Sequence, residues 1–274
     1  MKNTINKLIL GGTYFFKHEV NRMKNEGDVV SARKNFFKFK FNNLNFLLKQ
    51  RFNWMNKYLR NKNKIYELGS GAGFSRLYIN KPYIMTDVID SEWIDLKLDA
   101  LNLNLANNSC DAIITSHCIH HFAKPVVFFR ECERVLKPGG LILIQEINTS
   151  LMTRFFLRLM KHEGWSYDVD VFDETKAVNH KDDPWSANCA VPELLFNNLN
   201  TFHETFKSLE VIYDVKNEGF ILPLSGGVIS KINMIELPTW FLEIVNIIDR
   251  FLISFAPNIF AMGRSIIVKK RHKF

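Results

Sequence analysis

The sequence is poor in cysteine and lacks any long apolar run. Its four cysteines form neither a C-x-x-C pair nor a dense framework, which argues against a disulfide scaffold and a structural zinc site. No stretch of about 18 residues is free of charge, so no membrane-spanning helix is expected. The apolar part of MKNTINKLIL at the N-terminus is too short for a secretory signal and has no small-residue cleavage site. These absences predict a cytoplasmic protein with reduced thiols.

Composition and charge limit the classes of protein to which the chain can belong. With 47% hydrophobic and 23% charged residues, the 274-residue chain is long enough for one large domain or a core with an appendage, and it is not expected to be disordered. Residues 1–64 hold 15 Lys/Arg against 3 Asp/Glu, a net +12, while the whole chain has a net charge of +8. Such a basic arm can face nucleic acid, anionic lipid or an acidic substrate, or can be a solvated helix face.

Hydrophobic spacing predicts a helix over residues 34–60. The apolar residues that recur at steps of three and four are Phe37, Phe41, Leu44, Leu48, Phe52, Met55 and Leu59. They share one stripe of a helix, and lysines lie off it. This helix is expected to pack on the core.

From residue 64 short apolar runs alternate with helix-length stretches. The expected strands are 64–68, 83–88, 95–99, 111–116 and 141–147, and the helices between them are 73–80 and 125–136. The turn 137–140, Lys-Pro-Gly-Gly, should end the second helix and redirect the chain. Strands that alternate with helices predict an α/β fold with a mainly parallel sheet covered on both faces.

The second half of the chain has a looser pattern. Residues 150–190 contain a short helix and then an acidic region too long for a mere connector. Its carboxylates lack a regular ligand spacing, so no metal is predicted. A helix is expected at 191–207, a strand at 209–216, an amphipathic helix at 238–256 that covers the sheet, and a last strand at 264–270.

The most specific motif is a glycine-rich loop after the first strand. It reads Ile-Tyr-Glu-Leu-Gly-Ser-Gly-Ala-Gly-Phe over residues 65–74. Alternate glycines let a ligand approach the backbone, and N–H groups near a helix start favour a negative group. The dinucleotide fingerprint would need glycine where Phe74 stands, and the phosphate-loop Lys-Ser/Thr pair is absent.

Two carboxylates accompany this loop at strand ends, Asp87 and Asp99. Open α/β sheets bind ligands at that edge. Together with YELGSGAGF, TDV, LDALNL, SCDAIITSHCIHHF and RECERVLKPGGLILI, the set resembles the class I S-adenosylmethionine-dependent methyltransferases over residues 64–147, particularly their small-molecule branch. The resemblance implies a Rossmann-like fold with a seven-stranded sheet, a basic N-terminal helical segment (1–62), and a methyltransferase domain (63–274) with a C-terminal helical insertion. Its cofactor half would be 63–148 and its substrate-facing half 149–274.

The resemblance also implies roles for individual residues toward S-adenosylmethionine. Gly69, Ser70 and Gly71 would pass beneath its methionine part, and Glu67 would help hold the ammonium group. Asp87 would accept the two ribose hydroxyls, because a carboxylate offers two oxygens to vicinal donors. The remaining cofactor residues would be Asp99 at the adenine amino group, Ala100 and Leu101 at the ring edge, and His117 beside the sulfonium.

A hydroxyl acceptor needs a base. The candidates are His117, His120 and His121 after the fourth strand, Glu146 after the fifth, and His162-Glu163 in the following segment. His121, His162 and Glu146 are the predicted catalytic residues, because a histidine near its ordinary pKa of about 6.5 suits proton removal at neutral pH. His120 and His121 could instead pack or hydrogen-bond locally, and His162-Glu163 could cap a helix.

The favoured function is O-methylation of a sugar hydroxyl in a surface polysaccharide or of a related small molecule. The segment 223–227, Pro-Leu-Ser-Gly-Gly, is similar to bacterial methyltransferases of surface-polysaccharide synthesis. A lipid-linked acceptor would draw the basic N-terminal segment to the inner membrane face. The alternatives are a quinone or lipid methyltransferase, a basic nucleic-acid-binding protein, and a non-catalytic partner with the cofactor fold. Nucleic acid is disfavoured because no base-amino methyltransferase motif or RNA module is present.

Overall fold

The computed structural model describes residues 28–160, 163–229 and 232–272. The first 27 residues of the predicted basic segment and the predicted catalytic residue His162 therefore lie outside the described residues.

A seven-stranded sheet forms the centre of the molecule, with the order β3-β2-β1-β4-β5-β7-β6. Its strands are β1 (Ile65–Leu68), β2 (Ile84–Asp87), β3 (Leu96–Lys97), β4 (Cys110–Ser116), β5 (Leu136–Ile147), β6 (Leu209–Asn217) and β7 (Gly263–Lys270). The first five strands pair in parallel, and β7 runs antiparallel between β5 and β6. This topology confirms the Rossmann-like class I methyltransferase fold expected from the sequence.

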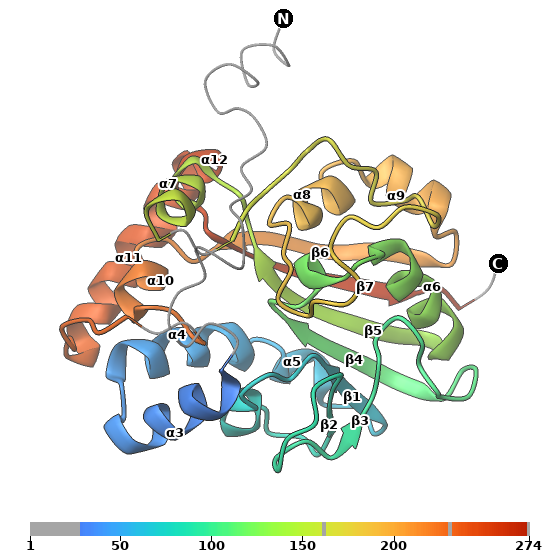
Figure 1. The fold of residues 1–274 in the computed structure, drawn as a ribbon, viewed down its shortest axis with the longest axis horizontal. Helices are drawn as coiled ribbons and strands as arrows, with labels where there is room; N and C mark the ends of the chain where they lie inside the picture. The colour runs from blue at the N-terminus through green and yellow to red at the C-terminus, as the bar shows by residue number, and fades with distance from the viewer. Residues whose placement is uncertain (1–27, 161–162, 230–231, 273–274) are drawn as a thin grey trace, which may run out of the picture.

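Helices cover both faces of the sheet (Figure 1). One buried cluster joins the sheet to α6 (Pro125–Val135), α8 (Val191–Phe196) and α9 (Leu199–Thr205). A second cluster joins the opposite face to α3 (Val29–Phe39), α4 (Asn42–Asn53), α5 (Asn56–Leu59) and α10 (Ile221–Ser225). Strand β1 is fully buried and β4 is mostly buried between these clusters, which explains why their sequences are rich in consecutive apolar residues.

The helix predicted over residues 34–60 is divided into α3, α4 and α5. Lys40 ends α3 in the left-handed region with φ 49°. The predicted apolar stripe is largely correct from Leu44 to Leu59, which pack in the core, but Phe37 is 46% exposed because it lies on the separate helix α3. A stripe of uniform spacing thus crosses two breaks in the helix.

Three further boundaries differ from the prediction. The helix expected at 73–80 is only a 3-10 turn at Phe74–Leu77, and the one expected at 191–207 is split into α8 and α9. Strand β5 begins at Leu136, before the glycines, and Gly139 adopts φ 78° within it. The Lys-Pro-Gly-Gly segment therefore belongs to the strand.

Helix α11 (Thr239–Phe255) buries Leu242 in the second cluster and contacts β6, but most of its apolar face is exposed, so the prediction that this face covers the sheet is only partly correct. Its Asp249 is turned inward, 2% exposed, and accepts hydrogen bonds from the backbone of Phe220 at 2.8 Å and Ile221 at 3.0 Å. The exposed side chains are instead Trp240, Phe241, Ile244, Ile247, Ile248, Phe251 and Phe255. Satisfying buried backbone N–H groups decides the orientation of this helix.

Helix α11 packs against the short helix α12 (Pro257–Phe260), and α12 packs against α7 (Leu151–Met160) (Figure 1). Phe155 and Leu159 of α7 are also more than half exposed. We call the exposed apolar residues of α7 and α11 the apolar ridge. Within the described part of the chain, no helix combines the length and the hydrophobicity needed to cross a bilayer.

Candidate active site

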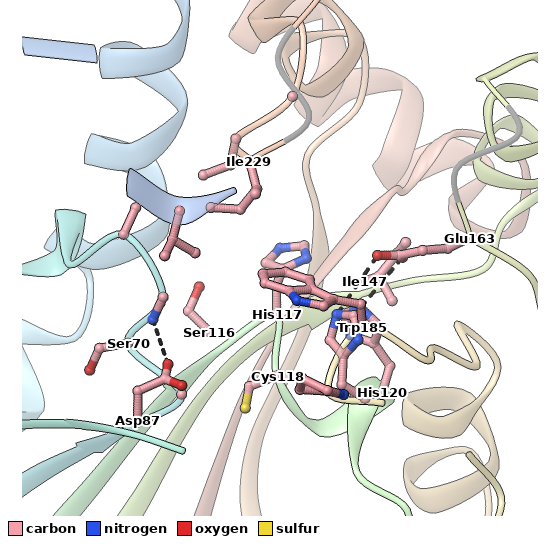
Figure 2. A pocket seen from close by; sticks show the side chains of 18 of the residues that line it. Ser70, Asp87, Ser116, His117, Cys118, His120, Ile147, Glu163, Trp185 and Ile229 are labelled. Carbon is pink, nitrogen blue, oxygen red and sulfur yellow. Dashed lines mark hydrogen bonds and ion pairs between the residues drawn. The ribbon is translucent and has the colours of Figure 1, made fainter. Parts of the chain in front are cut away.

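A cavity of about 800 Å³ opens at the carboxyl edge of the parallel strands. It is lined by every residue predicted to bind the cofactor, from Glu67 to His117, and also by the predicted catalytic residue His121. Figure 2 shows Asp87 and Ser70 on one side, and His120, Trp185 and Glu163 on the other. One continuous space therefore joins the glycine loop to a set of titratable side chains.

The glycine loop forms the wall of the cavity that follows β1. Gly69 and Gly71 adopt φ angles of 70° and 51°, in the left-handed region that favours glycine. A Cβ on Gly71 would meet no atom within 4 Å, whereas one on Gly69 would lie 2.2 Å from Sγ of Cys118. Gly71 thus keeps the cavity open, and Gly69 lets the loop after β4 pack closely.

Asp87 supports this loop from the end of β2. Its Oδ2 accepts the N–H of Gly71 at 2.8 Å, and its Oδ1 accepts that of Ile89 at 2.9 Å. Asp99 is exposed and its Oδ1 accepts the N–H of Leu101 at 2.8 Å, which fixes the turn that carries Ala100. Both carboxylates keep lone pairs available beyond these bonds.

Glu67 lies beneath the glycine loop and is 2% exposed. The hydroxyl of Ser75 donates to its Oε2 at 2.7 Å. Burial raises the pKa of Glu67 to about 7, against the opposing effect of the hydroxyl hydrogen bond. A ligand cation near this carboxylate would favour its ionised form.

His117 adopts φ 50° just after β4, and its N–H donates to the carbonyl of Gln145 at 2.7 Å. Its buried Nε2 has no hydrogen-bond partner among the described residues. Burial, and then the positive charge of Arg51, lower its pKa. A neutral imidazole with an unsatisfied nitrogen at a cavity wall suits contact with a ligand.

Glu146 is fully buried at the end of β5 and does not line the cavity. It accepts hydrogen bonds from the N–H groups of Cys118, Ile119 and Ile147 and from Nδ1 of His120, at 2.6–3.0 Å. Burial opposes its charge, but His120 and these bonds lower its pKa to about 2. Glu146 therefore fixes the loop after β4, which is a positioning role instead of the predicted catalytic one.

His120, His121 and Glu163 form a compact group, here called the acceptor cluster. Nε2 of His120 lies 3.5 Å from Oε2 of Glu163, and Nε2 of His121 lies 3.7 Å from Oε1. Burial opposes the charge of His120, but Glu146 and Glu163 outweigh it and raise its pKa to about 10. Burial and the neighbouring charge of His120 lower the pKa of His121 to about 4.

Two members of the site were not among the predicted catalytic residues. Glu163 was a candidate base in the pair His162-Glu163, but 42 positions separate it from His121, and the sequence did not indicate their contact. Arg51 of α4 lines the cavity and makes a bidentate ion pair with Glu218 at 2.8 Å. Only tertiary contact reveals where either residue lies, although an arginine inside the apolar stripe of α4 was a visible signal.

Comparison with known proteins identifies the class. A protein-family model described as a methyltransferase domain matches residues 67–144, from the glycine loop to β5. This segment is a class I S-adenosylmethionine-dependent methyltransferase domain, and S-adenosylmethionine is its cofactor.

Individual relatives are more distant. The ubiquinone biosynthesis O-methyltransferase of Parvibaculum lavamentivorans is 35% identical over 54 residues, which are 20% of this chain and 21% of that protein. The match thus spans about a fifth of this curated relative. A S-adenosylmethionine-dependent methyltransferase structure from Archaeoglobus fulgidus is 14% identical, with a TM-score of 0.45 over 98% of this chain and 99% of that one. One from Aquifex aeolicus is 22% identical, with a TM-score of 0.28 over 31% and 56%.

The residues present fit this cofactor. Open space at Gly71 admits a ligand to the backbone, and Asp87 and Glu67 offer carboxylates at two places along the same wall. Asp87 would hold the ribose hydroxyls, Glu67 the ammonium group and Asp99 the adenine amino group. The unsatisfied Nε2 of His117 would border the sulfonium end.

Proposed function

We propose that this protein methylates a hydroxyl group of an acceptor with an extended apolar part, in the class of quinols and lipids or lipid-linked sugars. The observation that carries this proposal is one continuous cavity with two facing parts. The glycine loop with Glu67, Asp87 and Asp99, here called the cofactor wall, faces the acceptor cluster. When bound, S-adenosylmethionine supplies an electrophilic methyl group. The protein's own task is to hold the acceptor oxygen in line with it and to exclude water.

The acceptor cluster is the polar end of the acceptor site. His121 and Glu163 line the cavity, and Nδ1 of His121 is held by the carbonyl of Ser186 at 3.1 Å. Hydrogen bonds from an acceptor hydroxyl to His121 Nε2 or to the carboxylate of Glu163 would orient it and assist loss of its proton. A cofactor-fold partner without catalysis would not need this arrangement.

An apolar part of the cavity lining favours a lipid or quinol. Its lining residues are Phe156, Leu157, Met160, Ile229, Ile232 and Met234. Leu159 lines the cavity and also belongs to the apolar ridge, so the apolar wall continues onto the exposed face of α7. The 54-residue similarity to a ubiquinone biosynthesis O-methyltransferase agrees with this acceptor class. Contact of the apolar ridge with a membrane surface would deliver such an acceptor.

A sugar acceptor is the second candidate. Trp185 lies at the cavity, 6.3 Å from His121 between ring centroids, and the neighbouring carboxylates of Asp182 and Asp183 also line it. An aromatic ring beside acidic groups is suited to stacking on a sugar and accepting its hydroxyls. Trp165, by contrast, is fully buried and anchors its loop.

Transfer of label from radioactive S-adenosylmethionine tests the proposal. The wild-type protein should label a quinol or a lipid-linked sugar in detergent. His121→Ala should lower the rate by about 100-fold or more, the contribution typical of a group that handles a proton. His272→Ala, which changes an exposed histidine outside the cavity, is the matched control. Labelling of free sugars alone would favour the second candidate, and labelling of no hydroxyl acceptor would reject the proposal.

A further inference from the structure

The hydrogen bonds of the acceptor cluster fix which histidine nitrogens point at Glu163. A carbonyl oxygen only accepts, so Nδ1 of His121 carries the hydrogen that reaches Ser186 at 3.1 Å. Nδ1 of His120 likewise donates to Glu146, at 2.6 Å. The other nitrogen of each ring, Nε2, faces the carboxylate of Glu163. A metal ion bound there would take the place of any proton on Nε2, because a histidine coordinates a metal as the neutral imidazole.

The spacing between these atoms is long for hydrogen bonds and close to that of two ligands of one ion. The N···O separations are 3.5 Å and 3.7 Å, and one ligand atom from each of the three residues lies within 4.8 Å of the others. Ligands about 2.0–2.2 Å from a tetrahedral Zn²⁺ stand about 3.4 Å apart. The two N···O separations therefore lie close to the spacing of zinc ligands.

The surroundings match those of a metal site. The side chains of His120, His121 and Glu163 are 3%, 18% and 11% exposed, so little water competes for them. Metal-bound histidines usually donate their second nitrogen to a carboxylate or carbonyl, as His120 does to Glu146 and His121 to Ser186. The thiol of Cys189 donates to Glu163 at 3.2 Å and orients the third ligand.

We infer that His120, His121 and Glu163 bind a divalent transition-metal ion of the Zn²⁺ type, with an open position toward the cavity. Two histidines and one glutamate are a ligand set of catalytic zinc sites, which leave a position for water or substrate. On the proposed function, that position accepts an oxygen of the methyl acceptor. The ion would orient the acceptor opposite the cofactor wall. His121 would then act as a ligand of the ion through Nε2, in place of accepting the acceptor's proton directly.

Metal binding by the full-length protein tests this inference independently of methyl transfer. After chelator treatment, the wild-type protein should take up one Zn²⁺ per chain in isothermal titration calorimetry, with the stoichiometry checked by elemental analysis. Glu163→Gln and His121→Ala should each weaken binding by more than about 100-fold, because losing even a residue hydrogen-bonded to a ligand costs about 10- to 100-fold. Glu174→Gln and His272→Ala, on exposed side chains, should bind as wild type.

Wild-type protein loaded with Co²⁺ or Cu²⁺ gives a readout that does not depend on the folding of variants. Visible absorption of the Co²⁺ form should show coordination lower than six, and pulsed electron paramagnetic resonance of the Cu²⁺ form should detect two histidine nitrogens. Absence of stoichiometric uptake, or unchanged affinity in a folded Glu163→Gln protein, overturns the inference. Metal binding without methyl transfer would reject the proposed function and retain the site. Methyl transfer that requires His121 in metal-free protein would make His121 a base and reject the metal.

Discussion

At the scale of single residues, the cofactor wall depends on a few atoms with distinct tasks. Asp87 both holds the N–H of Gly71 and faces the cavity. Gly71 provides space, and Glu67 provides a buried carboxylate whose charge depends on pH near neutrality. Each task leads to a separate prediction.

Asp87→Ala should weaken S-adenosylmethionine binding by about 10- to 100-fold, since hydrogen bonds to a charged group contribute about 1.5–3 kcal/mol. Isothermal titration calorimetry measures the change. Asp87→Asn, which keeps one acceptor oxygen for Gly71, should retain the fold and lose part of the affinity. Equal affinity of wild type and Asp87→Ala would remove Asp87 from the cofactor site.

Gly71→Val should abolish cofactor binding because its side chain would fill the open space above the loop. Gly71→Ala carries the same unfavourable φ of 51°, which costs about 1–2 kcal/mol for a residue with a Cβ, but adds less volume. Comparing the two variants by calorimetry and thermal melting separates backbone strain from steric exclusion. Full binding by the valine variant would contradict a ligand at this position.

Glu67 predicts a pH dependence. Burial in the fold raises the pKa of its carboxyl from 4.5 to about 7. The contribution of this group to the apoprotein's free energy of unfolding is therefore fully present below pH 4.5 and is lost as the pH rises through 7. Across this window the loss is about 3 kcal/mol. Cofactor affinity should change oppositely, rising with pH as the carboxylate ionises to hold the ammonium group.

Glu67→Gln should flatten both pH dependences. Urea unfolding at several pH values measures the first, and cofactor titration over the same range measures the second. Identical pH profiles for the wild type and Glu67→Gln would show that another group titrates.

At the scale of elements, one buried ion pair joins α4 to the end of β6. Arg51 and Glu218 are both less than 9% exposed, and Gln145 of β5 also donates to Glu218 at 2.9 Å. Glu218 stands at φ 53°, so this pair fixes a strained corner beside the cavity. The N-terminal helices are thereby part of the site and not merely a basic appendage.

Arg51→Met should destabilise the fold by about 3–5 kcal/mol, because it leaves the carboxylate of Glu218 buried without its partner. Urea unfolding measures the loss. Adding Glu218→Gln should recover part of it, as the uncompensated charge is removed. If the double variant lost the full sum of the two single losses, the pair would not be coupled.

At the scale of the whole molecule, the apolar ridge lies beside the apolar half of the cavity. Leu159 belongs to both, so an acceptor could pass from a membrane surface to the site without crossing water. The proposed membrane contact differs from the one expected from the sequence, which relied on the basic N-terminal segment.

Wild-type protein should therefore sediment with vesicles of phosphatidylcholine and phosphatidylglycerol. Phe251→Glu combined with Phe255→Glu should lower the bound fraction by about ten-fold or more, since burying a Phe side chain contributes about 1.5–3 kcal/mol. These residues are 70% and 85% exposed, so the fold should persist. Phe37→Glu, at an exposed aromatic on α3, is the control. Unchanged sedimentation of the double variant would exclude the ridge as the membrane contact.

The sequence by itself determined the fold and the cofactor wall. Alternating apolar runs define the parallel strands, and the motif residues lie next to them in the chain, so strand ends bring Gly71 and Asp87 together in any sheet of this order. The local sequence pattern is sufficient to predict these residues, because the carboxyl ends of neighbouring parallel strands lie at the same edge of the sheet.

Only the tertiary structure decided the acceptor side. The position of Glu163 beside two histidines, the pairing of Arg51 with Glu218, and the outward apolar face of α11 all depend on contacts between distant segments. Helix periodicity identifies the two faces of α11 but not which one is buried. Asp249 settled that question by satisfying two buried backbone N–H groups of another segment.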